Sequence, residues 1–328
     1  MIHLRMVVPP RQVDQTLTLL TATSAAANLV HLRGAVRRPD GDLVMCDVTS
    51  EDASSVVANL RELGVPEGGA IAIEPIASQI SGGAAATESS TSVSEAVVWE
   101  EVDTRTAGMT ALSAQFLAMM VLAMLVATAG IVQATSILIV GAMILGPDFG
   151  PVAGVCVAMV ERRGKLASRS LATLLIGFAF GIVVSGLVAL ALKNLGAFPA
   201  ALSETPQHLP RAVSSVTGGP NFFTFFVAFL AGVAGILSLS TAKTGVIIGV
   251  LVSVTTIPAA ANVALCGAYG QWGNVVSSAE QVGANIATLV VAGTLTLAGQ
   301  RAVYAHRRRV QRRGDPARAA AGLPMGSQ

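Results

Sequence analysis

Charged residues are scarce in this 328-residue sequence. Asp, Glu, Lys and Arg make up only 12% of it, about half the share of roughly 25% that is typical of soluble domains. Hydrophobic residues make up 52% and concentrate after residue 110. This distribution excludes a wholly soluble protein. It divides the chain into a front part of ordinary polarity, residues 1–110, and a membrane domain, residues 111–300.

Residues that commonly bind metals or perform catalysis are also few. The three cysteines (Cys46, Cys156 and Cys266) lie far apart, and the four histidines are scattered, so neither set has metal-ligand or disulfide spacing. No cluster of His, Asp and Glu, no paired nucleophile and base and no phosphate-binding loop is present. We therefore expect no enzyme, no cofactor and no nucleic-acid partner, and the sequence leaves open whether a metal binds.

Residues 1–76 alternate strand and helix patterns. The stretch PDGD at 39–42 is typical of a hairpin turn, and residues 51–63 form a helical pattern with acidic residues in the first turn. The predicted order is βαββαβ, the ferredoxin-like arrangement. We expect a cytoplasmic α+β domain that folds by itself and serves as an inert cap, as an oligomerisation module or as a module that senses a small ligand.

Between this domain and the membrane we expect a linker, residues 77–110. Its first part, 77–94, is rich in Ser, Ala, Gly and Thr and predicts a flexible chain. Its second part carries Trp99 among valines and acidic residues, which is typical of a short helix at the membrane interface.

The membrane domain contains six apolar segments, each near or above the roughly 20 residues that cross a bilayer. They run over residues 111–132, 134–160, 168–192, 222–240, 244–268 and 279–299. Basic residues gather in the loop 161–169, at Lys243 and in the tail 301–328, which has six arginines between 301 and 313. We expect the protein to span the inner membrane of the cell. The positive-inside rule then places both termini, including the basic tail, in the cytoplasm.

Two of the segments share a pattern. Each begins with Ala-Gly-Ile, at Ala129 and at Ala234, reaches a Gly and then a proline-bearing polar interruption, and ends in small residues around a Cys. Three spans in each half would invert the second copy relative to the first, as in many secondary transporters. We therefore predict a 3+3 inverted repeat with broken helices. The predicted break residues are Gly146, Pro147, Gly150, Pro151 and Pro258.

These stretches resemble an uncharacterised prokaryotic membrane family, domain of unknown function 389. The resemblance rests on LVATAGIVQATSILIVGAMILGPDFGPVAGVCVAMV, TGVIIGVLVSVTTIPAAANVAL and QVGANIATLVVAGTLTL, and covers about residues 111–300. Many members have a PLMGP core where this chain has GPDFGP at residues 146–151. Pro147, Gly150 and Pro151 fit that pattern, whereas Asp148 stands where the family usually has an apolar residue. The resemblance implies a fold and no activity.

The interruptions are candidate sites, because irregular backbone in a membrane is tolerated where protein buries it or where it lines a wet cavity. Asp148 supplies a carboxylate, which costs roughly 2.5–3.5 kcal/mol at a bilayer centre. The predicted ion- or substrate-binding residues are Asp148, Thr255, Thr256, Asn262 and Asn285. The alternative is packing: prolines shape the bundle, glycines let helices approach, and the asparagines form interhelical hydrogen bonds.

These observations favour a transporter or channel for an ion or small solute, with a cytoplasmic regulatory domain. The alternative is a membrane-anchored sensor or scaffold whose N-terminal domain binds a ligand or partner. We expect contacts with membrane lipids and a homo-oligomer, while the transported species, its direction and the coupling stay open.

Overall fold

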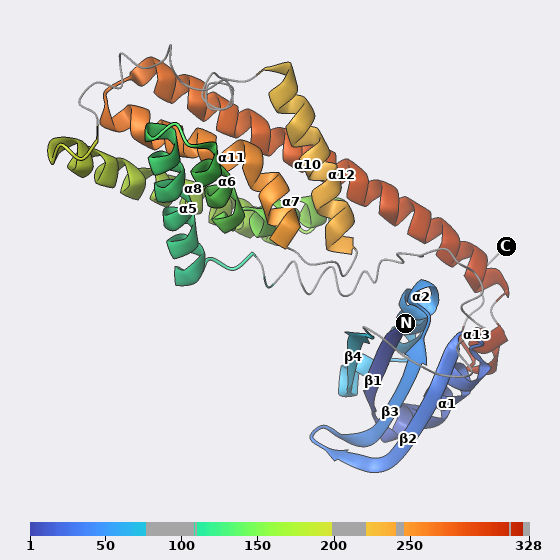
Figure 1. Ribbon diagram of the computed structural model, residues 1–328. Helices are drawn as coiled ribbons and strands as arrows, with labels where there is room; N and C mark the ends of the chain where they lie inside the picture. The colour runs from blue at the N-terminus through green and yellow to red at the C-terminus, as the bar shows by residue number, and fades with distance from the viewer. Residues whose placement is uncertain (77–107, 109, 199–220, 241–245, 315, 324–328) are drawn as a thin grey trace. The chain divides into compact units, whose positions relative to one another are not determined.

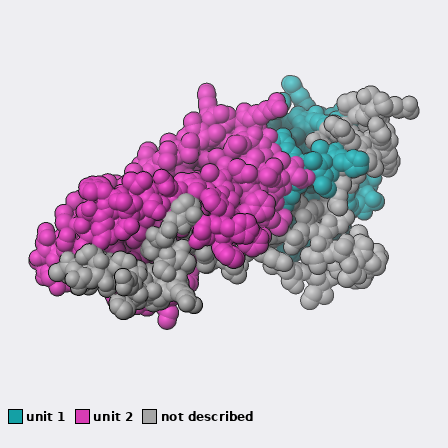
Figure 2. All heavy atoms as spheres, turned by 90° about the horizontal axis from the view of Figure 1, so that it is seen from above, with its two compact units in different colours: residues 1–102, 240–242, 300–328 teal, residues 103–239, 243–299 magenta. Residues whose placement is uncertain are grey.

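The computed structural model describes residues 1–76, 108, 110–198, 221–240, 246–314 and 316–323. The chain forms two compact units, which Figure 2 colours separately. Unit 1 contains the N-terminal residues 1–102 and the C-terminal residues 300–328, and unit 2 contains almost all of residues 103–299. The predicted linker and interfacial helix lie almost wholly outside the described residues.

Unit 1 is built on a small antiparallel sheet. Its strands are β1 (Ile2–Val8), β2 (Ala26–Arg37), β3 (Asp40–Val48) and β4 (Ala70–Pro75), in the order β2-β3-β1-β4 with antiparallel neighbours. The helices α1 (Val13–Ala22) and α2 (Ser50–Glu62) separate the strands along the chain (Figure 1). Two short helices, η1 (Pro10–Gln12) and α3 (Val65–Gly68), precede α1 and β4.

The core of unit 1 is built from every second side chain of its strands. In β1, Ile2, Leu4, Met6 and Val8 are buried, and the residues between them are more exposed. The buried side chains form one cluster with the apolar faces of α1 and α2. Because successive side chains of a strand point to opposite faces, His3 and Arg5 stand on the other face of the sheet.

The far end of the chain completes this core. The short helix α13 (Pro316–Ala320) packs against α1 (Figure 1). Ala317 and Ala321 are 0% and 5% exposed and belong to the same apolar cluster as Leu4 and Leu20. The sequence predicts a separate basic tail over 301–328, and the structure adds that the end of this segment is a packed part of unit 1.

Unit 2 is all helical. Its helices are α5 (Ala114–Val132), α6 (Ser136–Leu145), α7 (Phe149–Glu161), α8 (Gly164–Asn194), α10 (Phe222–Ser240), α11 (Val246–Ala268) and α12 (Trp272–Gly314), which continues into unit 1. Within the described residues, four are long and apolar enough to cross a membrane, and α6 with α7 makes a fifth if the bent pair is one span. Large apolar side chains such as Ile137, Leu187 and Phe222 are exposed on the outer faces. The chain is therefore a multi-pass membrane protein.

Several helices end close to the predicted limits, but α12 is much longer than the predicted 279–299. Residues 272–314 contain no proline, so nothing in the sequence ends the helix where its apolar part stops. The helices approach closely where glycine is present. A Cβ on Gly177 would lie 2.5 Å from Phe116 Cε1, and one on Gly181 would lie 2.6 Å from Met124 Sδ, so these positions set the contact between α8 and α5.

The helix break predicted around GPDFGP separates α6 from α7, and the two helices meet at 52°. Pro147 disfavours the helical region for the residue before it, and Gly146 has φ −63° and ψ 122°, in the extended region. Gly150 and Pro151, however, lie in the first turn of α7. A proline is tolerated there because the first N–H groups of a helix have no acceptor within it. The break is thus narrower than predicted and covers residues 146–148.

The second predicted break, at Pro258, is wrong. Helix α11 runs from Val246 to Ala268 with Pro258 inside it. A proline in a membrane helix removes one hydrogen bond, but neighbouring helices and local adjustment satisfy the freed group, so the helix continues. The two proline-bearing segments therefore differ: one is divided into two helices and the other is a single helix.

Candidate functional site

Asp148 is fully buried at the break between α6 and α7. Its exposed fraction is 0%, and it stands at the N-cap position of α7. Its backbone carbonyl accepts a hydrogen bond from the Val152 N–H at 3.2 Å, so the residue begins the helix. The N-terminal end of a helix carries a partial positive charge that favours a carboxylate. This position lowers the cost of burying the acid.

A second helix reaches the same carboxylate. The Thr256 Oγ1 on α11 donates a hydrogen bond to Asp148 Oδ2 at 2.5 Å, and Thr256 is itself 0% exposed. This distance lies at the short end of the range for a hydroxyl bound to an ionised carboxylate. The two proline-bearing segments therefore meet, through one residue from each.

The depth of this pair follows from the packing of α7 on α8. A Cβ on Gly154 of α7 would lie 2.6 Å from Ser170 Oγ of α8, so these two residues lie side by side at the same height along the two packed helices. Asp148 lies six residues before Gly154, about 9 Å along the chain direction of α7. Because α8 follows α7 after a tight turn and runs back along it, Asp148 is level with the middle turns of α8, which runs from Gly164 to Asn194.

The structure places Asn262 in a different network. Its Nδ2 donates to Ser278 Oγ at 2.8 Å, and its Oδ1 lies 3.5 Å from Cys266 Sγ. The first bond joins α11 to α12. Asn262 is one and two-thirds turns beyond Thr256 on α11, so its side chain points in a different direction around the helix. These contacts agree with the alternative given for Asn262 in the sequence analysis, an interhelical hydrogen bond and not an ion ligand.

Helix α12 carries a buried polar stripe that the sequence analysis missed in part. Ser278, Gln281 and Asn285 are 0%, 2% and 0% exposed, and spacings of three and four residues place them on one helix face. Asn285 is among the predicted residues; Ser278 and Gln281 are not. The pattern was visible in SSAEQVGAN at 277–285. Gln281 Oε1 has no hydrogen-bond partner within the described residues.

The side chain of Thr255 lies outside the described part of the structure, which gives only its place in α11. Among the described side chains of unit 2, Asp148 is the one buried ionisable group apart from cysteine. No group of three His, Cys, Asp or Glu residues that could hold a metal is present in the described residues. The carboxylate at the break therefore belongs to no described cluster of metal-binding side chains, and the hydroxyl of Thr256 is one of its partners.

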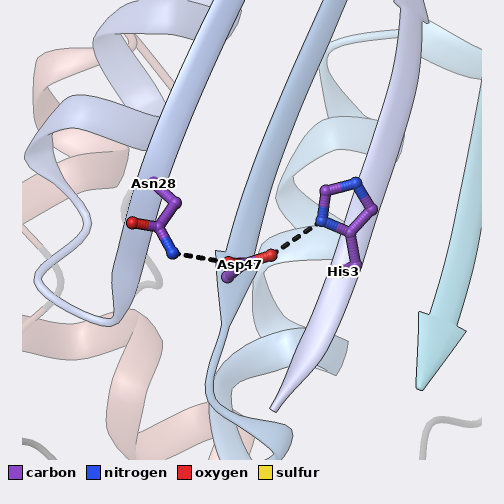
Figure 3. A network of polar contacts seen from close by, with 3 residues as sticks. All are labelled: His3, Asn28 and Asp47. Carbon is purple, nitrogen blue, oxygen red and sulfur yellow. Dashed lines mark hydrogen bonds and ion pairs between the residues drawn. The ribbon is translucent and has the colours of Figure 1, made fainter. Parts of the chain in front are cut away.

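A second polar network lies on the sheet of unit 1. Asp47, 7% exposed, accepts a hydrogen bond from Asn28 Nδ2 at 2.7 Å, and its other oxygen is 2.7 Å from His3 Nδ1 (Figure 3). Asn28 has φ 51° at a shift in the register between β2 and β3. Asparagine tolerates this left-handed conformation better than most residues. The network therefore holds the irregular part of β2 against β3 and β1.

The hairpin of β2 and β3 has its own carboxylate contact. Asp42 Oδ1 accepts the Gly34 N–H at 2.8 Å, and its Oδ2 is 2.7 Å from His31 Nε2. The backbone hydrogen bond from Gly34, followed by that from His31, lowers the pKa of Asp42 below its ordinary value. Burial acts in the opposite sense on Cys46, where it raises the pKa of the thiol to about 11.

Comparison with known proteins agrees with the resemblance noted in the sequence. The family described as Domain of unknown function (DUF389) matches residues 143–291, which include the break, Asp148 and Thr256. No curated protein and no solved structure matches the chain. The family description assigns no activity.

Proposed function

We propose that the protein is a transporter or channel for an ion or small solute, and that its site is the buried Asp148–Thr256 pair. The observation that carries this proposal is a fully buried carboxylate at a helix break, bonded to a hydroxyl of a second helix. Ionisable residues inside membranes are costly, and they commonly mark pathways for ions or protons. Broken helices at mid-depth are likewise typical of binding sites in transporters.

The proposed topology has six spans with both ends in the cytoplasm. The packing of α13 in the core of unit 1 supports it, because two ends of a chain that share one core lie on the same side of a membrane. An even number of spans is then required. Counting α6 with α7 as one span and α11 as another gives six. The basic residues of the segment 161–169 and the arginines of the tail support a cytoplasmic location for this side.

The proposed architecture of unit 2 is a 3+3 inverted repeat. Its support is the matched order of elements: α5, the α6–α7 pair and α8 correspond to α10, α11 and α12. Each middle element carries a proline, and each contributes one residue to the buried pair. For unit 1 we propose a ferredoxin-like fold, which the strand order β2-β3-β1-β4 supports.

The test is transport by the purified full chain in liposomes, measured as charge movement on a solid-supported membrane after steps of Na⁺, K⁺, H⁺ and small organic solutes. Asp148→Asn keeps the size of the side chain and removes the charge, and we expect at least a tenfold loss of the signal. Glu280→Gln is the matched control, since Glu280 is an exposed carboxylate on α12. A wild-type protein that moves nothing, or an Asp148→Asn variant with wild-type rates, contradicts the proposal.

A sensor or scaffold is the second candidate, and one observation favours it. Leu29, Val30 and Leu32 of β2 are 37%, 40% and 45% exposed, so an edge of the sheet in unit 1 presents apolar side chains. Such surfaces often contact a partner, which here would be another copy of the chain or a regulatory ligand. Leu32→Lys should then lower the oligomeric mass of the detergent-solubilised protein. An unchanged mass argues against a role in assembly.

A further inference from the structure

We infer that Gln281 of α12 is a further ligand-binding residue of the Asp148–Thr256 site, and that the ion bound there is a cation. The inference rests on the proposed transport function and deepens it, because it adds a third helix to the site and names the class of the ion. It is drawn from the register between the helices, from the burial of one face of α12 and from an acceptor atom that lacks a donor.

Contacts between α11 and α12 give the height of Gln281 along the bundle. Asn262 Nδ2 donates to Ser278 Oγ at 2.8 Å, so these two residues lie at one height. The helices run in opposite directions, because residues 269–271 form a tight turn between them. Thr256 is six residues before Asn262, and Gln281 is three residues after Ser278. The heights of Thr256 and Gln281 therefore differ by three residues, about 4.5 Å along the helix axes.

Contacts between α7 and α12 give a second, independent register. Cys156 Sγ donates to the Val290 carbonyl at 3.6 Å, and Thr294 Oγ1 lies 3.8 Å from Met159 Sδ. These contacts join residues that are 134 and 135 positions apart, so the two helices run in the same direction with a nearly constant offset.

The two registers agree on the position of Gln281. The offset of 134 residues places it one residue, about 1.5 Å, from the height of Asp148. The register with α11 places it within one turn of Thr256. Asp148 and Thr256 share a hydrogen bond and must themselves lie at one height, and both registers meet this condition within a turn. Gln281 is therefore at the height of the buried pair, on a third helix.

Gln281 stands on a face of α12 that points into the bundle. Five residues of this face are at most 2% exposed and follow one another at spacings of three and four: Ser278, Gln281, Asn285, Leu289 and Ala292. At one end of this face Ser278 bonds α11, and at the other end Leu289 and Ala292 lie against α10. Gln281 and Asn285 lie between these two contacts, so they face the interior at the height of the pair.

The side-chain carbonyl of Gln281 is an acceptor without a donor. The residue is 2% exposed, and its Oε1 has no hydrogen-bond partner within the described residues. The turn of α11 at the same height contains Ala259, Ala260 and Ala261, all 0% exposed, whose side chains have no donor to offer. A buried acceptor that bonds nothing is costly. A ligand that brings a positive charge or a donor to this oxygen removes that cost.

A cation is the ion that such an oxygen can bind. Gln281 Oε1 accepts and cannot donate, and an ionised Asp148 carboxylate likewise only accepts. Carboxylate and amide oxygens are ligands of hard cations, and in channels carbonyl oxygens replace the water shell of the ion. An anion would meet the negative end of the amide dipole. The amide oxygen attracts a cation whichever other groups contact Asp148, so its contribution does not depend on the charge balance around the carboxylate.

A cation bound at this height would connect three helices. Asp148 begins α7, Thr256 belongs to α11 and Gln281 to α12. A ligand that binds the folded state and not the unfolded chain stabilises the fold in proportion to its occupancy. Cation binding should therefore appear as a rise in the unfolding temperature, which can be measured without transport.

The first experiment is thermal unfolding of the purified full chain in detergent, with NaCl, KCl, NH₄Cl or CaCl₂ added while N-methylglucamine chloride keeps the ionic strength constant. We expect the unfolding temperature to rise with the concentration of at least one of these cations and to reach a plateau. Gln281→Leu should raise the half-saturating concentration about tenfold, the loss expected for one contact to a charged group. Gln281→Glu, which keeps an oxygen at this position, should restore the response.

The matched control is Gln271→Leu, the same exchange in the turn before α12, where Gln271 Oε1 accepts from Asn274 Nδ2 at 3.0 Å. It should leave the half-saturating concentration unchanged. Without a cation, Gln281→Leu should unfold at the wild-type temperature or above it, because an apolar side chain replaces an acceptor that has no donor. A structural role would instead lower this temperature. An unchanged half-saturating concentration in Gln281→Leu overturns the inference, whatever its stability.

The second experiment separates this site from the transport function. Charge movement on a solid-supported membrane is recorded with the cation that binds, and Gln281→Leu should raise its KM about tenfold, in step with the binding measurement. A protein that moves an anion or an uncharged solute, and binds no cation, overturns the cation assignment and leaves the proposed transport function intact. A protein that binds a cation through Gln281 but moves nothing overturns the transport function and leaves the site in place.

Discussion

Individual acidic residues in this protein are held in three different ways. Asp148 is buried in unit 2 beside a hydroxyl and a helix N-terminus, Asp47 is held by an amide and an imidazole, and Asp42 by a backbone N–H and an imidazole. In each, donors face the carboxylate oxygens, since a buried acid without donors is costly. The membrane acid differs in that its donor comes from a helix distant in sequence.

Asp42 gives a prediction at this scale. Its pKa lies below the ordinary value of 3.8 in the folded protein, so the folded state is stabilised above pH 3.8 and loses this contribution as the pH falls through the lower folded value. Carbon NMR of the labelled full chain in nanodiscs should give an Asp42 titration midpoint below 3.8. In His31→Ala the midpoint should rise but stay below that value, because the Gly34 hydrogen bond remains. A wild-type midpoint at or above 3.8 contradicts the contacts assigned to this hairpin.

At the scale of elements, the features that matter are the short α13 and the proline-bearing helices. Helix α13 has only five residues, too few to be stable by itself. It is held by the apolar core of unit 1, to which it adds Ala317. Its small side chains allow close packing on α1, so a larger or charged residue there should loosen the whole unit.

Ala317→Asp should therefore destabilise unit 1, because it places a charge at a position that is 0% exposed. The loss should be about 3 kcal/mol or more, in the range of a buried unpaired charge. Ala319→Asp is the matched control, since Ala319 is exposed on the same helix. Cys46 reports the change: it is 0% exposed, and its raised pKa of about 11 keeps it a thiol at pH 8. Maleimide labelling of Cys46, followed by mass spectrometry, should be fast in Ala317→Asp and slow in wild type and control.

If Cys46 labels equally slowly in both variants, the contact between α13 and α1 contributes nothing to the stability of unit 1. The N-terminal residues 1–76 would then be sufficient for their own fold, as their apolar pattern predicts.

At the scale of the whole molecule, the shared core of the two chain ends limits the topology. The proposed arrangement of six spans agrees with this shared core, and it would place the α7–α8 turn and the α11–α12 turn on opposite sides of the membrane. The first turn is basic and the second carries no charge, which matches the positive-inside rule.

This topology predicts the labelling of two introduced cysteines in intact cells. Trp272→Cys, at an exposed position that begins α12, should react with a membrane-impermeant maleimide added outside. Arg163→Cys, exposed in the α7–α8 turn, should react only after the cells are opened. Both variants should be made in a background without Cys46, Cys156 and Cys266. Labelling of residue 163 from outside, or of 272 only from inside, rules out this arrangement.

The sequence alone determined the features that depend on local chemistry. The proline at 147 predicted the break between α6 and α7, because a proline restricts its own residue and the one before it. The low charge and the long apolar segments predicted a membrane protein, and the alternating residues of β1 predicted a strand with one buried face.

Only the tertiary structure decided which distant residues meet. Asp148 and Thr256 are 108 positions apart, and no local pattern states that their oxygens come within hydrogen-bond distance. The same holds for Asn262 with Ser278 and for Ala317 with the core of unit 1. Pro258 is the opposite case. Its local preference predicts a break, but α11 is a continuous helix that packs against α5, α6 and α8. Local preferences are below about 1 kcal/mol for most residues and about 3 kcal/mol for proline, so tertiary contacts of similar size decide between the alternatives.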